Sequence, residues 1–351
     1  MTDSAAGAAP AGGLDYRSAG VDLDRAERDK AGLRGLLERT RDSQTLSELG
    51  HFGGLYAVPG DVPEPVLVSS ADGVGTKLKV AFLTGRHDTV GRCLVNHCVN
   101  DILVQGARPL FFLDYIATGV VAEGVVHDVV RGVAEGCREN ACALLGGETA
   151  QMPDFYGEGE YDLAGFIVGI VARSRILDGS RVQAGDLLVG LPSSGLHTNG
   201  YTLARKILLE ATGLGVDDEV PGLGRSVADT LLDVHRSYLP LLREELEGHA
   251  IRALAHITGG GIPGNLPRTL PPGLGARIDK GSWRIPPVFR VLQELGGTDE
   301  EEMFRVFNMG VGMIAVAGAD SAPGLVERLR AAGEAAWILG EVEEGDGVRI
   351  A

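Results

Sequence analysis

Several features that mark other protein classes are scarce or missing in this chain of 351 residues. Basic residues are outnumbered, with 32 Lys and Arg against 48 Asp and Glu and a net charge of −16. Without a basic cluster to neutralise a phosphate backbone, nucleic acid is not an expected partner. The longest apolar runs, such as residues 166–172, are far too short to span a membrane, so no membrane partner is expected either.

Cysteine is also scarce, since the chain has 4. Cys93 with Cys98 and Cys137 with Cys142 are spaced more widely than the ligands of most zinc modules, which favours buried free thiols. Residues 1–13 are rich in Ala and Gly and lack the basic start and apolar core of a signal peptide. They predict a disordered tail, and the cytoplasm is the default location.

Two common catalytic signatures are missing as well: the His-Glu-x-x-His zinc helix and the Gly-x-Ser-x-Gly nucleophile elbow. The chain instead alternates expected strands and helices, punctuated by 52 glycines. The expected helices are 88–107, 125–140, 199–212, 227–245 and 323–332, and the expected strands are 66–68, 110–116, 143–145, 161–172, 187–191, 313–317 and 337–339. This alternation predicts an α/β (or α+β) protein with two domains, 14–178 and 179–351.

The most informative stretch is Asp72-Gly73-Val74-Gly75-Thr76-Lys77, which follows the apolar run 66–68. It brings together a carboxylate, main-chain N–H groups that glycine leaves accessible, a hydroxyl and an ammonium. Together these groups suit a magnesium-bound polyphosphate. The order of residues differs from that of the usual phosphate loop, which ends in Gly-Lys-Ser/Thr. An ordinary strand-to-helix turn is the alternative interpretation.

Two further acidic motifs are candidates for the same metal site. Asn100 and Asp101 lie late on an expected helix, where His97 shares a face with Asp101 because they are four residues apart. Glu148 and Thr149 follow a pair of glycines and offer hard oxygen ligands for Mg²⁺. A locally hydrogen-bonded polar stripe and a turn with a solvated acid are the respective alternatives.

A loop in the second half has the character of a phosphate site. It leaves the expected strand 187–191 and enters a helix, whose first N–H groups attract anions. Its candidate phosphate-binding residues are Ser193, Ser194, Gly195, Thr198, Asn199 and Gly200. His197 in this loop and His256, which shortly precedes a triple glycine, are candidates for proton transfer. For the loop, a simple helix cap with an exposed histidine is the alternative.

Together these motifs resemble the phosphoribosylformylglycinamidine cyclo-ligases, also called aminoimidazole ribonucleotide synthetases. The segments that carry the resemblance are 16–22, 72–77, 99–101, 105–109, 146–150, 193–201, 256–261 and 307–313. They occur in order from about Leu14 to the end of the chain.

The resemblance implies a step of purine biosynthesis. ATP phosphorylates the formyl amide oxygen of formylglycinamidine ribonucleotide, and a substrate nitrogen then closes the imidazole ring, releasing ADP and phosphate. Asp72, Asp101 and Glu148 would hold Mg²⁺, and a monovalent cation such as K⁺ is a further candidate. The residues expected to contact ATP are Gly73, Gly75, Thr76, Lys77, Asn100 and Thr149. Asp72, His197 and His256 are the expected catalytic residues, with His197 ranked above His256 for proton transfer.

The family's fold also implies a homodimer. Its N-terminal domains pair their sheets into a shared barrel with ATP near the interface, and the C-terminal domain is an α/β sandwich that binds substrate. The chain departs from the family pattern at Gln151, where Glu is common, at Arg34, where a lysine is expected, and at Leu196, which replaces a proline. These departures put the roles of Gln151 and Arg34 in question.

Other functions share part of the pattern. Thiamine-monophosphate kinases, selenophosphate synthetases and the amidotransferase of the preceding purine step share the Asp-Gly and Asn-Asp motifs. The segments 193–201 and 256–261 argue against the first two, and the lack of a glutaminase domain argues against the third. A catalytically silent nucleotide-binding subunit is a different class. It would normally lack a metal-binding acid or His197, and this chain has both.

Overall fold

The first half of the chain forms one β-sheet and the helices that cover it. The computed structural model describes residues 15–16, 18–48 and 50–351, so the expected tail at 1–13 lies outside the described residues. The elements are α1 (Leu23–Glu38), β1 (Pro65–Gly73), α2 (Lys77–Thr84), α3 (Asp88–Leu103), β2 (Arg108–Thr118), α4 (Val125–Glu139), β3 (Ala143–Gln151) and β4 (Tyr161–Ala172). The strands lie in the order β1-β4-β2-β3, with β2 and β3 parallel and the other neighbours antiparallel.

The second half forms a larger mixed sheet. Its elements are β5 (Leu187–Pro192), α5 (Tyr201–Arg205), a π-helix (Lys206–Ala211), α6 (Val227–Leu231), α7 (Leu239–Glu247), β6 (Ile251–His256), α8 (Gly261–Asn265), β7 (Leu274–Ile278), α9 (Pro287–Gly296), α10 (Glu300–Val306), β8 (Val311–Ala317), α11 (Ala322–Ala331), β9 (Trp337–Glu344) and β10 (Val348–Ile350). The strands lie in the order β10-β7-β9-β5-β8-β6, with β7 and β10 parallel.

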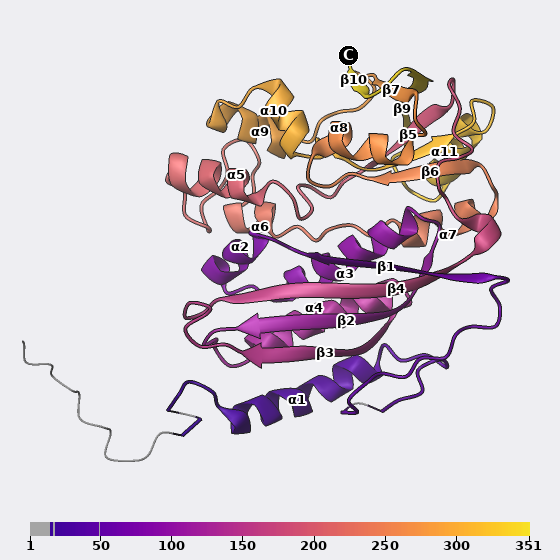
Figure 1. Ribbon diagram of the computed structural model, residues 1–351. Helices are drawn as coiled ribbons and strands as arrows, with labels where there is room; N and C mark the ends of the chain where they lie inside the picture. Colours follow the sequence, from indigo (N-terminus) through magenta and orange to yellow (C-terminus); the bar gives the residue numbers. More distant parts are fainter. Residues whose placement is uncertain (1–14, 17, 49) are drawn as a thin grey trace, which may run out of the picture.

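Helices α3 and α4 cover one face of the first sheet, and the second half is stacked on the other side of α3 (Figure 1). The two helices pack closely because a glycine on each helix lies against the backbone of the other. A Cβ atom at Gly91 would lie 2.2 Å from the carbonyl oxygen of Val129, and one at Gly132 would lie 2.0 Å from that of Asp88. Any larger residue at either position would force the helices apart.

The second sheet is buried on both faces at its centre. Every residue of β8 is buried, and from Met313 to Ala317 alternate side chains belong to two different apolar clusters, as the two-residue period of a strand requires. One of these clusters runs without interruption from α3 and α4 through α7 and α11 to β5 and β8. The two domains therefore share a continuous hydrophobic core rather than meeting only at a polar surface.

Several expected elements are confirmed. The helices at 88–107, 125–140 and 323–332 correspond to α3, α4 and α11, and the strand 161–172 is β4. The helix at 199–212 is present as α5 followed by the π-helix. A two-domain α/β fold with mixed sheets is confirmed.

Three expectations are wrong. The helix at 227–245 is broken into α6 and α7 by an extended segment, residues 232–238. Residues 146–149 are not a turn after a short strand but the middle of β3. Strand β9 extends well beyond 337–339, and the chain closes with β10 instead. Each error comes from long-range pairing that local residue patterns do not encode.

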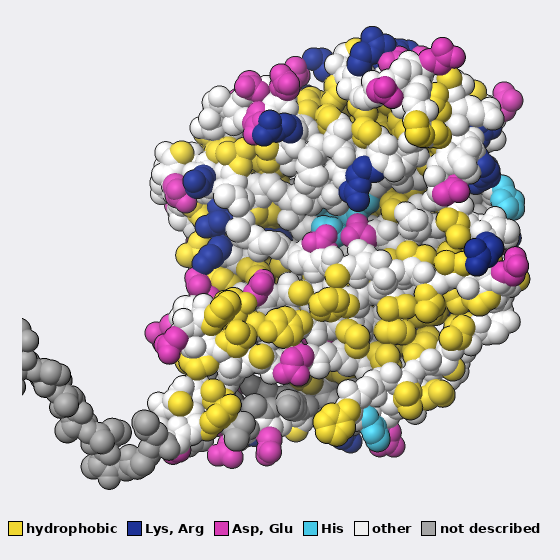
Figure 2. Space-filling view, in the orientation of Figure 1, with side chains coloured by type: hydrophobic (Ala, Val, Ile, Leu, Met, Phe, Trp, Pro, Cys, Tyr) yellow, Lys and Arg dark blue, Asp and Glu magenta, His cyan; other side chains and the backbone are white. Residues whose placement is uncertain are grey.

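The outer face of the first sheet is apolar and uncovered by helices. Figure 2 shows a band of hydrophobic side chains across it. Phe166, which lies opposite Leu113 and Ala71 in the register, is 46% exposed, and Leu67 is 60% exposed. Among the described residues, no helix is both long enough and apolar enough to cross a membrane.

Candidate active site

A cleft of about 730 Å³ lies between the two domains. One wall is β1 with the C-terminal part of α3, and the other is the end of β6 with the segment that follows it. The polar lining residues are Ser69, Ser70, Asp72, His97, Asp101, Gln105, His256, Thr258, Asn265, Arg268 and Thr269. Three of the sequence-predicted residues, Asp72, Asp101 and His256, therefore meet in one place although they come from three elements.

Asp72 is the penultimate residue of β1, and its side chain is 43% exposed. Its Oδ1 accepts a hydrogen bond from the N–H of Gly73 at 2.7 Å, and its Oδ2 lies 2.9 Å from Nε2 of His97. Burial alone would raise the pKa of Asp72, but the contact with His97 and the N–H of Gly73 lower it below its usual value. Asp72 is therefore an anion at neutral pH that still faces the cleft.

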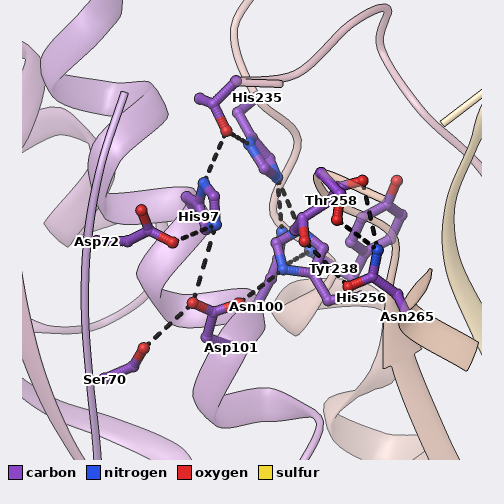
Figure 3. A network of polar contacts seen from close by, with 12 residues as sticks. Ser70, Asp72, His97, Asn100, Asp101, His235, Tyr238, His256, Thr258 and Asn265 are labelled. Atoms are coloured by element: carbon purple, nitrogen blue, oxygen red, sulfur yellow. Dashed lines mark hydrogen bonds and ion pairs between the residues drawn. The ribbon is translucent and has the colours of Figure 1, made fainter. Parts of the chain in front are cut away.

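Asp101 lies on α3 in the same wall, and its side chain is 25% exposed. Oδ1 lies 2.9 Å from Nδ1 of His256, and Oδ2 accepts a hydrogen bond from Oγ of Ser70 at 3.1 Å (Figure 3). Burial raises the pKa of Asp101, but the contacts with His256 and His97 outweigh it and lower the pKa overall. Two carboxylates held ionised on one wall suit a hard divalent cation.

The pKa values of the two histidines beside these acids, His97 and His256, are shifted in opposite directions. Burial opposes protonation of His97, yet the hydrogen bond with Asp72 and the charge of Asp101 raise its pKa. Burial lowers the pKa of His256 despite the contact with Asp101. His97 is thus the one inclined to carry a proton, and His256 is inclined to be neutral.

His197 lies behind the cleft rather than on its wall. It is 1% exposed, has a left-handed backbone with φ of 61°, and its ring stacks on that of His235 at 4.0 Å. Its Nε2 accepts a hydrogen bond from the N–H of Ser194 at 3.1 Å, while its Nδ1 is buried without a partner. Burial lowers its pKa far below the usual value. A strained, neutral histidine with an unpartnered donor is a costly arrangement that functional sites often retain.

The extended segment 232–238 brings in His235, which sequence reasoning missed. Its main chain is held by α3: Asn96 donates to the carbonyl of His235, and Asn100 donates to the carbonyl of Arg236, each at 2.8 Å. Asn100 also accepts a hydrogen bond from the N–H of Tyr238 at 3.0 Å. Asn100, expected to contact ATP, thus binds this segment and is fully buried. No local signal marked His235, because its neighbours have helical apolar spacing.

Lys77, also expected to contact ATP, is fully buried at the junction of the domains. Its ammonium donates to the carbonyl oxygens of His197 at 3.0 Å and Asp233 at 2.5 Å, and lies 3.2 Å from Sγ of Cys93. Burial opposes its charge, but Cys93 and Tyr201 raise the pKa of Lys77 to about 12. Gly75 and Thr76 remain exposed, and Oγ1 of Thr76 lies 3.0 Å from that of Thr202.

The hydroxyls of the expected phosphate loop already have protein partners. Oγ of Ser193 donates to the carbonyl of Gly195, and Oγ of Ser194 donates to that of Val234. Thr198 is buried between His97 and His235. Gly200 has φ of 76° and begins the helix, whereas Nδ2 of Asn199 is buried without a partner. The loop thus has two unpartnered side-chain nitrogens, in Asn199 and His197.

Glu148 and Thr149 do not join the cleft within one chain. They lie on β3 at one edge of the sheet, whereas Asp72 lies on β1 at the other. The register places Glu148 level with Gly73 but three strands away, a separation of roughly 14 Å. The exposed Glu148 is therefore not a ligand to an ion held by Asp72 and Asp101 of the same chain.

The two family departures lie apart from the cleft. Oε1 of Gln151 accepts a hydrogen bond from the N–H of Asp22 at 3.1 Å, so this side chain ties β3 to the segment before α1. Arg34 is exposed on α1. Arg268, in contrast, was not foreseen, yet it lines the cleft opposite the two acids and lies 3.3 Å from Oδ1 of Asn265. An arginine facing two carboxylates allows the cleft to hold an anion and its cation together.

Comparison with known proteins gives consistent results. Residues 54–171 match the family described as AIR synthase related protein, N-terminal domain, and residues 183–351 match the corresponding C-terminal domain. The chain is 55% identical over 331 residues to a phosphoribosylformylglycinamidine cyclo-ligase of Sorangium cellulosum (strain So ce56), covering 94% of this chain and 95% of that protein. It is 50% identical over 337 residues to one from Geobacillus kaustophilus (strain HTA426), covering 96% and 97%.

A solved structure shares the fold at much lower identity. Thiamine-monophosphate kinase from Stenotrophomonas maltophilia K279a superposes with a TM-score of 0.68 at 20% identity, covering 91% of this chain and 95% of that one. This likeness concerns the fold alone. Kinase activity, one of the alternatives considered from the motifs, gains no support from it.

Proposed function

The chain belongs to the phosphoribosylformylglycinamidine cyclo-ligase family, and we propose that the cleft between its domains is where the family's reaction takes place. The enzyme uses ATP to convert formylglycinamidine ribonucleotide into 5-aminoimidazole ribonucleotide, ADP and phosphate, a step of de novo purine biosynthesis. The observation that carries the proposed location is the convergence of Asp72, Asp101 and His256 on one cleft.

The reaction needs the formyl amide oxygen to become a good leaving group, which its phosphorylation achieves. Phosphoryl transfer depends mainly on positioning and on neutralisation of charge. Asp72 and Asp101 are ionised, partly exposed and carry oxygen ligands, so they fit Mg²⁺, which supplies charge neutralisation on the ATP phosphates when bound. Arg268 on the opposite wall is the candidate for a second contact with phosphate oxygens.

For proton transfer we propose His256 ahead of His197, which reverses the order expected from the sequence. His256 lines the cleft and its lowered pKa leaves it able to accept a proton at neutral pH. His197 has no place on the cleft wall, and its buried Nδ1 is suited to donate a hydrogen bond to a ligand once the loop 193–200 rearranges. The loop keeps its proposed role as the ribose phosphate site through its main-chain N–H groups and Asn199.

A homodimer is proposed through the outer face of the first sheet. The supporting observation is the uncovered apolar band that includes Leu67 and Phe166, a patch suited to pairing with its own copy across a two-fold axis. Phe166→Glu should yield monomers in analytical ultracentrifugation, because a carboxylate would be buried in the interface. Val120→Glu, which changes an exposed apolar residue in the loop after β2, is the control and should remain dimeric.

A dimer also offers a place for Glu148 as a metal or nucleotide ligand contributed by the partner. Mixing Asp72→Asn and Glu148→Gln subunits separates this from a site within one chain. If Asp72 of one subunit works with Glu148 of the other, half of the mixed dimers are hybrids with one intact site, so roughly a quarter of the wild-type rate returns. If mixing restores no activity, Glu148 does not act across the interface.

Three further expectations stay proposals: the domain limits 14–178 and 179–351, a cytoplasmic location and a requirement for K⁺. The main activity is tested by measuring ADP release with Mg²⁺ and ATP. We expect ADP only when formylglycinamidine ribonucleotide is present, and Asp101→Asn should abolish it. Equal ADP release without that substrate would contradict the proposed function.

A further inference from the structure

Four of the chain's 8 histidines gather beside the cleft, which is more than phosphate chemistry requires. They are His97 on α3, His197 in the loop after β5, His235 in the extended segment and His256 at the end of β6. Among the described residues, two overlapping groups place their ligand atoms within 4.8 Å of one another: His197, His235 and His256, and His97, Asp101 and His256.

The first group has the wrong geometry for a metal ion. A coordinated metal lies in the plane of each imidazole ring, on the lone pair of a nitrogen. The rings of His197 and His235 stack at 4.0 Å with only 19° between their planes, so their lone pairs do not converge. In addition, Nε2 of His197 already accepts a hydrogen bond from Ser194, which puts the proton on Nδ1.

The second group has the right geometry. The rings of His97 and His256 are 85° apart, so they are not stacked as the rings of His197 and His235 are. Nε2 of His97 lies 2.9 Å from Oδ2 of Asp72 and 3.8 Å from Oδ2 of Asp101, and Nδ1 of His256 lies 2.9 Å from Oδ1 of Asp101. Ligands about 2.0–2.2 Å from a tetrahedral ion are roughly 3.3 Å from one another. These separations bracket that value.

Outer contacts hold both rings in the required orientation and tautomer. Nδ1 of His97 lies 2.7 Å from Oγ1 of Thr198, which can accept a hydrogen bond from Nδ1–H and so leave the lone pair of Nε2 free for a metal. Nε2 of His256 lies 3.0 Å from Nε2 of His235, which can accept a hydrogen bond from Nε2–H of His256 and so leave the lone pair of Nδ1 free. Such second partners are the usual companions of metal-binding histidines. In such a site His235 would be the outer partner that orients the ring of His256 (Figure 3).

We propose that His97 and His256, with Asp72 and Asp101, form a two-nitrogen, two-carboxylate site for a first-row transition ion such as Co²⁺ or Zn²⁺. Nitrogen ligands favour these ions, whereas Mg²⁺ prefers oxygen alone. The cleft gives an entry path to the two buried rings. The inference rests on residues of the proposed function, because it shares both carboxylates and His256 with it, so a transition ion competes with Mg²⁺ for the carboxylates and occupies the histidine proposed for proton transfer.

The test is a titration of the full-length, untagged, EDTA-stripped protein with Co²⁺, followed by visible absorption and by metal analysis. We expect one ion per chain with the spectrum of mixed nitrogen and oxygen coordination. His97→Asn and His256→Asn should each weaken binding by more than the roughly 10–100-fold that loss of an outer partner costs. Thr198→Val should weaken it within that range. His127→Asn, which changes a partly exposed histidine on α4, is the matched control and should bind as wild type.

Each outcome decides the inference. Absence of Co²⁺ binding, or equal affinity in His97→Asn and His127→Asn, overturns it. Because a variant can fail to fold, circular dichroism is recorded first, and His97→Gln, which retains a polar side chain of similar reach, serves as a second variant. Wild-type protein that turns over with Mg²⁺ but binds no Co²⁺ refutes the inference and leaves the proposed function intact. Protein that binds Co²⁺ but releases no ADP with substrate contradicts the proposed function and leaves the inferred metal site intact.

Discussion

Asp72 and Lys77 are five residues apart in one motif, yet the structure gives them opposite surroundings. The Asp72 side chain is 43% exposed and faces the cleft, whereas Lys77 is fully buried and bonded to carbonyls of the second domain. The chain turns between them, where β1 ends and α2 begins, so the two charges point to different places. A motif that looks like a single phosphate site has a proposed metal ligand at one end and a link between domains at the other.

The largest effect that tests this comparison is expected at Asp72. Asp72→Asn should reduce kcat by about three orders of magnitude, because it removes a carboxylate that, on the proposed function, would hold Mg²⁺ with the ATP phosphates. Steady-state ADP release is the measurement, and thermal unfolding should show a folded protein. Asp320→Asn, which changes an exposed acid in the turn after β8, is the control. A wild-type rate in Asp72→Asn would remove Asp72 from the active site.

Lys77→Met should act mainly on stability, by about 2–3 kcal/mol. The carbonyls of His197 and Asp233 would lose their donor, and each unsatisfied buried group costs roughly 1–3 kcal/mol. Urea unfolding measures the loss. Lys79→Met on the same helix removes a half-exposed lysine paired with Glu160 and should cost less than about 1 kcal/mol. Equal stability of the two variants would show that Lys77 does not hold the domains together.

A smaller effect is expected in the pH dependence of stability, measured with EDTA. The pKa of His97 is raised from 6.5 in the folded state, so its contribution is complete below 6.5 and is lost as the pH rises through the folded value. The gap in unfolding free energy between wild type and Asp72→Asn should therefore shrink from pH 6 to pH 9. It should stay below about 1 kcal/mol, because Asp72 is screened by solvent.

The Lys77 end should not share this behaviour. The pKa of Lys77 is about 12, so its charge is constant over the same range. The gap between wild type and Lys77→Met should be flat from pH 6 to pH 9. A gap that widens with pH at Asp72, or one that changes at Lys77, would contradict the assignment of the two ends.

The smallest effect is expected at Thr76, between the two. Thr76→Val removes an exposed hydrogen bond to Thr202, so stability should change by less than about 0.5 kcal/mol. If Thr76 contacts ATP, the KM for ATP should rise with little change in kcat, whereas Thr202→Val should leave KM unaltered. An unchanged KM for ATP in both variants would show that Thr76, like Lys77, does not contact ATP.

Part of this site could be predicted from the sequence, because its signals are local. Asp72 follows an apolar run that is a strand, and Asp101 lies four residues from His97 on a helix that exists. Strand order is not local, so nothing in the sequence placed Glu148 at the opposite edge of the sheet from Asp72. The prediction of a helix through the segment 232–238 was wrong for a similar reason. Its apolar spacing is helical, but hydrogen bonds from Asn96 and Asn100 to its main chain favour an extended path.

Those hydrogen bonds give the segment 232–238 an unusual freedom. Asn96, Asn100 and Lys77 bind its peptide groups, which every amino acid except proline supplies in full, and the one side chain among these contacts is that of His235, whose Nε2 lies 3.3 Å from Nδ2 of Asn100. Position 235 can therefore be altered during evolution, or by an engineer, while the path of the backbone is kept. A library of substitutions there would vary the chemistry next to His256 on a fixed scaffold. The side chain behind His256 can therefore be exchanged without redesign of the backbone around it.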